Sequence, residues 1–174
     1  MTTKSGERIA ELTTARCVLR PVRFDDAERL HRLWSSPGVR RYLWDGAEIP
    51  FTRTMAAIDQ SERLFAERNY GLWCVWSIDS SELAGFGGLW PFRDPPDIEL
   101  VYGVAEPLWG AGYATEIARA VVGYCFDELD MLAVNASTDT GNLASVRVLE
   151  KVGFTFVRQD IVGGVHTLFY ELKG

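Results

Sequence analysis

The sequence has few of the features that mark metal-binding, disulfide-rich or membrane proteins. It contains only three cysteines and two histidines among 174 residues, and Cys17, Cys74 and Cys125 stand far apart, without the spacing of metal ligands or redox pairs. We expect each to be a small buried hydrophobic residue, in a protein of a reducing compartment. No run approaches the roughly 18 consecutive apolar residues of a membrane span. The polar start, Met1 to Glu11, lacks the apolar core of a signal peptide. We therefore expect a cytoplasmic protein without a bound metal, with residues 1–11 as a flexible N-terminus.

The chain also lacks an excess of positive charge. It has 18 Lys and Arg against 24 Asp and Glu, which gives a formal net charge of −6. Because nucleic acids and anionic membranes are held largely by fields of Lys and Arg, this balance disfavours both as partners. The composition does include 47% hydrophobic and 12% aromatic residues, enough for one core at this length. We expect a single domain over residues 1–174.

The spacing of apolar residues changes along the chain and predicts an α/β fold. The pattern favours a mixed, mostly antiparallel sheet of about seven strands with helices on both faces. The expected elements are, in order, a strand at 16–20, a helix from 27 that stops at 35–38, a helix from Thr52 or Thr54 to 69, strands at 73–78, 83–89 and 98–104, a helix at about 113–129, a strand at 132–137, a helix at 142–152, and strands at 154–161 and 165–172.

The strongest local signal is the turn between strand 98–104 and the helix that follows it. Gly110 and Gly112 let backbone N–H groups approach a ligand. The helix start adds unpaired N–H donors and the positive end of the helix dipole. Together these features predict an anion site, although a glycine pair before a helix also occurs in tight connections that bind nothing.

The position of this turn disfavours two common phosphate-binding classes. A dinucleotide-binding fold places its glycines after the first strand and uses a third glycine, whereas here three strands and two helices come before the unit and Thr115 stands in the third place. The acidic candidate Asp139 comes only after the fifth strand. The chain also lacks the Gly-Lys-Ser/Thr of an NTPase P-loop. A nucleotide oxidoreductase or an NTPase is therefore a poor match.

Two segments of the chain resemble the GNAT N-acetyltransferases, and most of all their RimJ/RimL branch. They are Pro107 to Glu116 (PLWGAGYATE) and Asn142 to Phe154 (NLASVRVLEKVGF). The opening Arg16 to Pro21 (RCVLRP) and the strand Glu99 to Val104 stand where that family has its first and fourth strands. The resemblance therefore spans nearly the whole chain. It implies a single-domain GNAT-like fold, acetyl-CoA as co-substrate, and acetyl transfer to a primary amine without an acyl-enzyme.

The same resemblance implies where acetyl-CoA binds. Its pantetheine arm would enter between the fourth and fifth strands and pair with the backbone of Tyr102, Gly103 and Val104. It would also meet Asn142, which is a common type of helix N-cap. Its pyrophosphate would meet the N–H groups of the turn. The cofactor-binding residues implied in this way are Tyr102, Gly103, Val104, Trp109, Gly110, Ala111, Gly112, Tyr113, Ala114, Thr115, Asn142 and Ser145.

Ser145 is a candidate catalytic residue. Helical spacing puts it on a stripe with Val148, Leu149 and Val152, so its hydroxyl faces inward. By resemblance, that hydroxyl lies near the thioester sulfur and protonates or hydrogen-bonds the leaving thiolate. The alternative is a hydroxyl bonded to the carbonyl one turn back.

Glu99 is the other candidate catalytic residue, because it is an ionisable group in an apolar strand beside the expected thioester. Only a neutral amine attacks, and at pH 7 about one α-amine in seven and about one lysine amine in 2,500 are neutral. Glu99 would act as general base, directly or through a water. The alternative is a carboxylate on the solvated face of the strand or in an ion pair.

The acceptor pocket is expected between the loop after the first helix, the turn after the third strand and the last hairpin. The acceptor would be a protein N-terminus or a small-molecule amine, and the chain would work as a monomer or homodimer. A second hypothesis is a non-catalytic acyl-CoA-binding or regulatory module, which the presence of Glu99 and Ser145 disfavours. The predicted pocket residues are Tyr42, Trp44, Trp90, Phe92 and Tyr170 as walls, with Asp45, Asp94 and Asp97 to attract a cationic amine.

Overall fold

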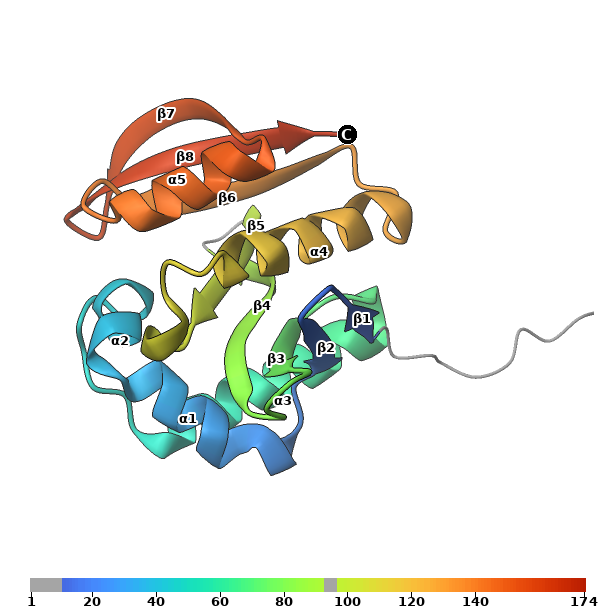
Figure 1. The fold of residues 1–174 in the computed structure, drawn as a ribbon. Helices are drawn as coiled ribbons and strands as arrows, with labels where there is room; N and C mark the ends of the chain where they lie inside the picture. Colours follow the sequence, from blue (N-terminus) through green and yellow to red (C-terminus); the bar gives the residue numbers. More distant parts are fainter. Residues whose placement is uncertain (1–10, 93–96) are drawn as a thin grey trace, which may run out of the picture.

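A twisted sheet of eight strands runs through the molecule, which a computed structural model describes over residues 11–92 and 97–174 (Figure 1). The strand order is β1-β2-β3-β4-β5-β6-β8-β7. All neighbouring strands are antiparallel except β5 and β6, which are parallel. The predicted mixed, mostly antiparallel α/β sheet is confirmed. Asp94 and the expected flexible N-terminus, apart from Glu11, lie outside the described residues.

The predicted elements occur in the predicted order with small shifts at their ends, and the structure adds β1 and α2 to them. The strands are β1 (Leu12–Thr13), β2 (Cys17–Pro21), β3 (Leu72–Ser77), β4 (Leu83–Phe92), β5 (Asp97–Val104), β6 (Ala133–Asp139), β7 (Thr155–Val162) and β8 (Val165–Lys173). The helices are α1 (Ala27–Ser35), α2 (Pro37–Leu43), α3 (Phe51–Arg68), α4 (Tyr113–Asp127) and α5 (Leu143–Val152), with short 3₁₀ turns η1 (Phe24–Asp26) and η2 (Glu106–Leu108).

The first helix stops where the sequence predicts, because α1 ends at Ser35. The helix α2 was not predicted, and Pro37 is its first residue, where the restricted φ of proline suits a helix start. One prediction about a helix start is wrong. Thr52 and Thr54 do not cap α3, because the helix begins at Phe51 after Pro50. Thr54 is instead buried, with its Oγ1 2.8 Å from Nδ1 of His31.

Helices cover both faces of the sheet. α4 and α5 lie on one face (Figure 1), over a core that includes Leu100, Ile117 and Leu149. α1 and the first half of α3 lie on the other face, over a second core that includes Leu30 and Ile58. The three cysteines are free and buried, as predicted.

β5 and β6 diverge after a single registered pair, Glu99 with Asn135. β4, by contrast, pairs with β5 from Gly85–Val104 to Phe92–Asp97. The edge of β5 that faces β6 is therefore open beyond Leu100. In the described part of the chain, no helix has the length and apolar character to cross a membrane.

Candidate active site

The turn from β5 into α4 forms a backbone cradle. Gly110 and Gly112 have φ values of 76° and 87°, which side-chain-bearing residues rarely adopt. The N–H of Glu116 makes the first bond of the helix, to the carbonyl of Gly112 at 3.1 Å. By helix geometry, the N–H groups of Tyr113 to Thr115 come before that bond and point out of the helix end. The cradle therefore fits an anion, as the two glycines predict.

The open edge of β5 offers further backbone groups. Ala105 N–H donates to the carbonyl of Ala84 at 2.8 Å, so the antiparallel alternation turns Gly103 toward β4 as well. The same alternation turns the N–H and C=O groups of Tyr102 and Val104 toward β6. The Val104 carbonyl accepts a hydrogen bond from Trp109 Nε1 at 2.7 Å. The N–H and C=O of Gly103 therefore face β4 and not the open edge, and its contact with the pantetheine arm stays a prediction.

Tyr102 and Ser145 meet on the α4 and α5 face of the sheet. The Oη of Tyr102 lies 2.9 Å from the Oγ of Ser145, and either atom can donate. Burial raises the pKa of Tyr102 and the hydrogen bond to Ser145 lowers it, but burial has the larger effect and the pKa is raised to about 12. The phenol is therefore protonated at neutral pH. Only the backbone of Tyr102 was predicted to take part in the site, although strand alternation places its side chain on the same face as Leu100.

Asn142 positions Ser145 at the start of α5. Its Oδ1 accepts the backbone N–H of Ser145 at 3.2 Å, which is the N-cap contact expected for this residue type. The cap closes the first turn of α5 and places Ser145 next to Tyr102. A contact between Asn142 and the cofactor stays a prediction.

Glu99 lies on the opposite face of β5, because successive strand residues point to opposite sides. Its side chain is only 2% exposed, and Ser137 Oγ donates a hydrogen bond to its Oε2. Trp90 pairs directly with Glu99 across β4 and β5, and Phe92 pairs with Asp97. Two predicted wall residues therefore lie beside the candidate base.

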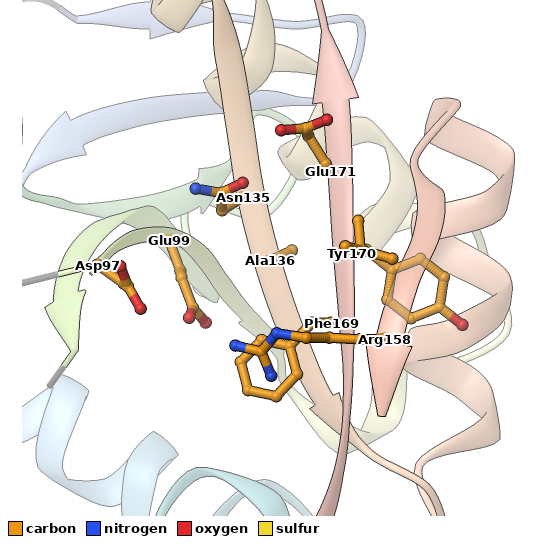
Figure 2. Close-up of a pocket in the computed structure, with 9 residues that line it drawn as sticks. Asp97, Glu99, Asn135, Ala136, Arg158, Phe169, Tyr170 and Glu171 are labelled. Atoms are coloured by element: carbon orange, nitrogen blue, oxygen red, sulfur yellow. The ribbon is translucent and has the colours of Figure 1, made fainter. Parts of the chain in front are cut away.

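A cavity of about 180 Å³ borders Glu99. Figure 2 shows the Arg158 guanidinium over the ring of Phe169, on the side of the cavity that faces Asp97 and Glu99. The guanidinium carbon is 3.7 Å from the ring centroid. Sequence analysis missed Arg158 and Phe169, because only the order β5-β6-β8-β7 brings them near Glu99. The cavity is lined by Asp97, Glu99, Asn135, Ala136, Val157, Arg158, Phe169, Tyr170 and Glu171.

The other predicted acceptor residues lie in different places. Tyr42 Oη donates to the carbonyl of Gly141 at 3.2 Å and so links α2 to the loop before α5. Trp44 packs edge-on against Trp34, with ring centroids 5.7 Å apart. Tyr170 borders the cavity, but Figure 2 shows its ring pointing away from Glu99. A role of Trp44 or Tyr170 in acceptor binding stays a prediction.

Asp139, at the end of β6, is held near another carboxylate. Burial raises its pKa, and the charge of Asp45 raises it further. A raised pKa means that the folded chain binds the proton more tightly than the unfolded chain does. The free energy of unfolding therefore falls as the pH rises through the range in which Asp139 titrates. The whole of this loss of stability is present at neutral pH.

Replacing Asp139 by asparagine should remove this cost. We expect the Tm of Asp139→Asn to exceed that of wild type by about 1 to 3 °C at pH 7, and the gain to vanish at pH 3, where aspartate is protonated in both states. Thermal unfolding across this pH range measures the effect. Asp79→Asn, in an exposed turn, is the matched control and should change nothing. A gain that persists at pH 3 would contradict the electrostatic cause.

Comparisons with known proteins identify the family of the chain. The chain matches the family model described as an acetyltransferase (GNAT) domain over residues 16–155. The N-acetyltransferase YoaA of Bacillus subtilis (strain 168) is 29% identical over 144 residues, which cover 82% of this chain and 81% of YoaA.

Two solved structures share the fold. The acetyltransferase from Agrobacterium tumefaciens str. C58 superposes with a TM-score of 0.83 at 21% identity and covers 100% of both chains. The ribosomal L7/L12 alpha-N-protein acetyltransferase RimL, in complex with coenzyme A, superposes with a TM-score of 0.78 at 16% identity and covers 94% of this chain and 98% of RimL. The family predicted from the two sequence segments is confirmed: the chain belongs to the GNAT acetyltransferases and is an acetyl-CoA-dependent N-acetyltransferase.

Proposed function

We propose that this enzyme transfers the acetyl group directly to a primary amine, with Glu99 as general base and the Tyr102–Ser145 pair as proton donor to the leaving thiolate. One observation carries the proposal. The two groups lie on opposite faces of β5, beside the strand edge that β6 leaves open. An acetyl donor in that opening would have an acid on one side and a base on the other.

The backbone cradle and the open edge would hold acetyl-CoA. The N–H groups of Gly110 and of Gly112 to Thr115 would bind its pyrophosphate, because a helix start supplies positive potential without a formal charge. Those of Trp109 and Ala111 already donate to the carbonyls of Glu106 and Leu108, at 3.1 and 3.4 Å. Tyr102 N–H and C=O and Val104 N–H would pair with its pantetheine arm. The coenzyme supplies the acetyl group as an activated thioester. The RimL complex supports this assignment, since RimL has the same fold and binds coenzyme A.

The protein residues would move two protons as the C–N bond forms and the C–S bond breaks. Glu99 would accept the proton of the amine, directly or through a water, and the hydrogen bond from Ser137 would orient its carboxylate. A proton from the hydroxyl pair would reach the sulfur. A backbone N–H near Val104 would stabilise the developing oxyanion.

The acceptor side favours a positively charged amine, such as a protein N-terminus or a small-molecule amine. The cavity beside Glu99 is lined by the carboxylates of Asp97, Glu99 and Glu171 and by one guanidinium, that of Arg158. The formal charge of this lining is therefore negative. Such a surface attracts an ammonium group and raises its local concentration.

The charge of this surface should appear in the kinetics. Asp97→Asn and Glu171→Gln should each raise the KM of a cationic amine about 3- to 10-fold and leave the Kd of coenzyme A unchanged, because both carboxylates line the cavity that only the acceptor would enter. Initial rates measure this. An aryl amine that is neutral at pH 7 is the control acceptor. An unchanged KM for the cationic amine would show that neither carboxylate takes part in acceptor binding.

Release of thiol from acetyl-CoA tests the function itself. The panel should include peptides with free N-termini, polyamines, amino acids and aryl amines, with acetylated products identified by mass spectrometry. We expect acetylation of at least one cationic primary amine. Binding of coenzyme A without acetylation of any amine would favour the alternative, a non-catalytic acyl-CoA-binding module.

A further inference from the structure

Arg16, the residue before β2, contacts the cradle at several points. Its Nη1 donates to the carbonyl of Ala111 at 2.9 Å. Its Nε and Nη2 each lie 2.7 Å from Oε2 of Glu116, and its backbone N–H donates to Oε1 at 2.9 Å. The guanidinium also stacks 4.1 Å from the ring centroid of Tyr113. A single side chain thus holds the turn, the first turn of α4 and the start of β2 together.

Glu116 would be unfavourable beside a phosphate if it had no partner. Burial tends to raise its pKa, but hydrogen bonds from Thr14 and Arg16 hold the pKa below its usual value, so the carboxylate is ionised. It lies in the first turn of α4, where the helix dipole stabilises a carboxylate as well as a bound anion. An ionised Glu116 therefore opposes any anion bound at the same helix end.

The turn has no cation of its own to offset this charge. Pro107 to Glu116 includes no Lys or Arg. The guanidinium that contacts it comes from Arg16, 95 residues before Ala111 in the chain. The side chain of Arg16 is 38% exposed, so the cation faces the solvent side of the cradle as well as Glu116.

We propose that Arg16 is a positioning residue for coenzyme A, which neutralises Glu116 and holds the Ala111 carbonyl so that the turn presents N–H groups to the phosphates. This inference rests on the proposed cofactor site. It explains how a chain with a net charge of −6 offers a polyanion a neutral or positive local surface. Arg suits this role better than Lys, because its planar fork reaches a carboxylate and a carbonyl at once.

Isothermal titration of coenzyme A into full-length variants tests the proposal. Arg16→Met should raise the Kd about tenfold, because it leaves an unneutralised carboxylate at the phosphate site. Glu116→Gln should bind at least as tightly as wild type. The double variant Arg16→Met/Glu116→Gln should recover most of the lost affinity. If Arg16 only linked β2 to α4 structurally, the double variant would bind coenzyme A at least as weakly as Arg16→Met does.

Kinetics and a matched control complete the test. Arg16→Met should raise the KM of acetyl-CoA and leave kcat and the amine KM unchanged, with Arg16→Lys between it and wild type. Arg63→Met, which removes an exposed ion pair with Asp59 in α3, is the control and should keep the wild-type Kd. If Arg16→Met does not fold, Arg16→Lys with and without Glu116→Gln decides the same question.

Three results would overturn the proposal: wild-type affinity in Arg16→Met, an unrecovered double variant, or a fall in kcat at unchanged Kd. A wild-type protein that binds no coenzyme A would overturn the proposed cofactor site, and this inference with it.

Discussion

Replacing Glu99 by glutamine is expected to lower kcat at pH 7 by about a hundredfold or more, the usual contribution of a positioned general base. The substitution keeps the size of a side chain that is 2% exposed and its ability to accept the hydrogen bond from Ser137. It removes the negative charge and, with it, the capacity to take a proton. The Kd of coenzyme A should stay unchanged, because Glu99 lies on the face of β5 opposite the Tyr102–Ser145 pair.

The size of the loss should depend on the acceptor. A lysine-like amine is neutral in about one molecule in 2,500 at pH 7, against about one in seven for an α-amine, so it depends more on a base. The rate of Glu99→Gln should rise about tenfold per pH unit until the amine itself is neutral. Pre-steady-state or steady-state rates from pH 6 to 10 measure this.

Glu171→Gln provides the comparison for Glu99→Gln, because both residues line the same cavity. Its effect should be confined to the KM of a cationic amine. If Glu99→Gln keeps the wild-type kcat with both amines, the base has been wrongly assigned, although the enzyme could still acetylate amines without it.

Removal of the hydroxyl pair should have the second largest effect. Tyr102→Phe and Ser145→Ala should each lower kcat by roughly 10- to 100-fold, because each deletes one of two hydroxyls that lie 2.9 Å apart. The kcat of the double variant should be little lower than that of the less active single variant, since two groups that pass one proton act as a unit. Single-turnover rates with saturating acetyl-CoA measure the step.

The pH dependence of the wild-type rate gives a second test of this pair. The pKa of Tyr102 is raised to about 12 by burial, so the phenol stays protonated, and able to donate, throughout the range from pH 7 to 10. Deprotonation of Tyr102 should therefore not lower the wild-type rate at any pH below 10. Tyr70→Phe is the matched control, because burial also raises the pKa of this tyrosine, which lies before β3 and outside the cavity beside Glu99. Equal losses in Tyr102→Phe and Tyr70→Phe would contradict a specific role.

Several local features followed from the sequence because they depend on residues close together in the chain. Asn142 caps α5 and Gly153 ends it with a φ of 111°, as their residue types and positions indicate. The beginning of α2 was missed for a non-local reason. Gly38 lies so close to Trp109 that an added Cβ would clash with its ring, and the Gly38 N–H donates to Glu106 Oε1 at 2.7 Å. Contacts 68 residues apart thus stabilise a helix start that the Pro37–Gly38 pair alone does not reveal.

By itself, the sequence determined the parts of the site that lie within one short segment: the cradle between β5 and α4, the inward face of Ser145 and the place of Glu99 in an apolar strand. Periodicity and glycine conformation act over a few residues, so they can be read without the fold. Only the tertiary structure decided which side chains meet, since strand order and register join residues far apart in the chain. They place Glu99 with Ser137, 38 residues away, Tyr102 with Ser145, 43 residues away, and Arg16 with Glu116, 100 residues away.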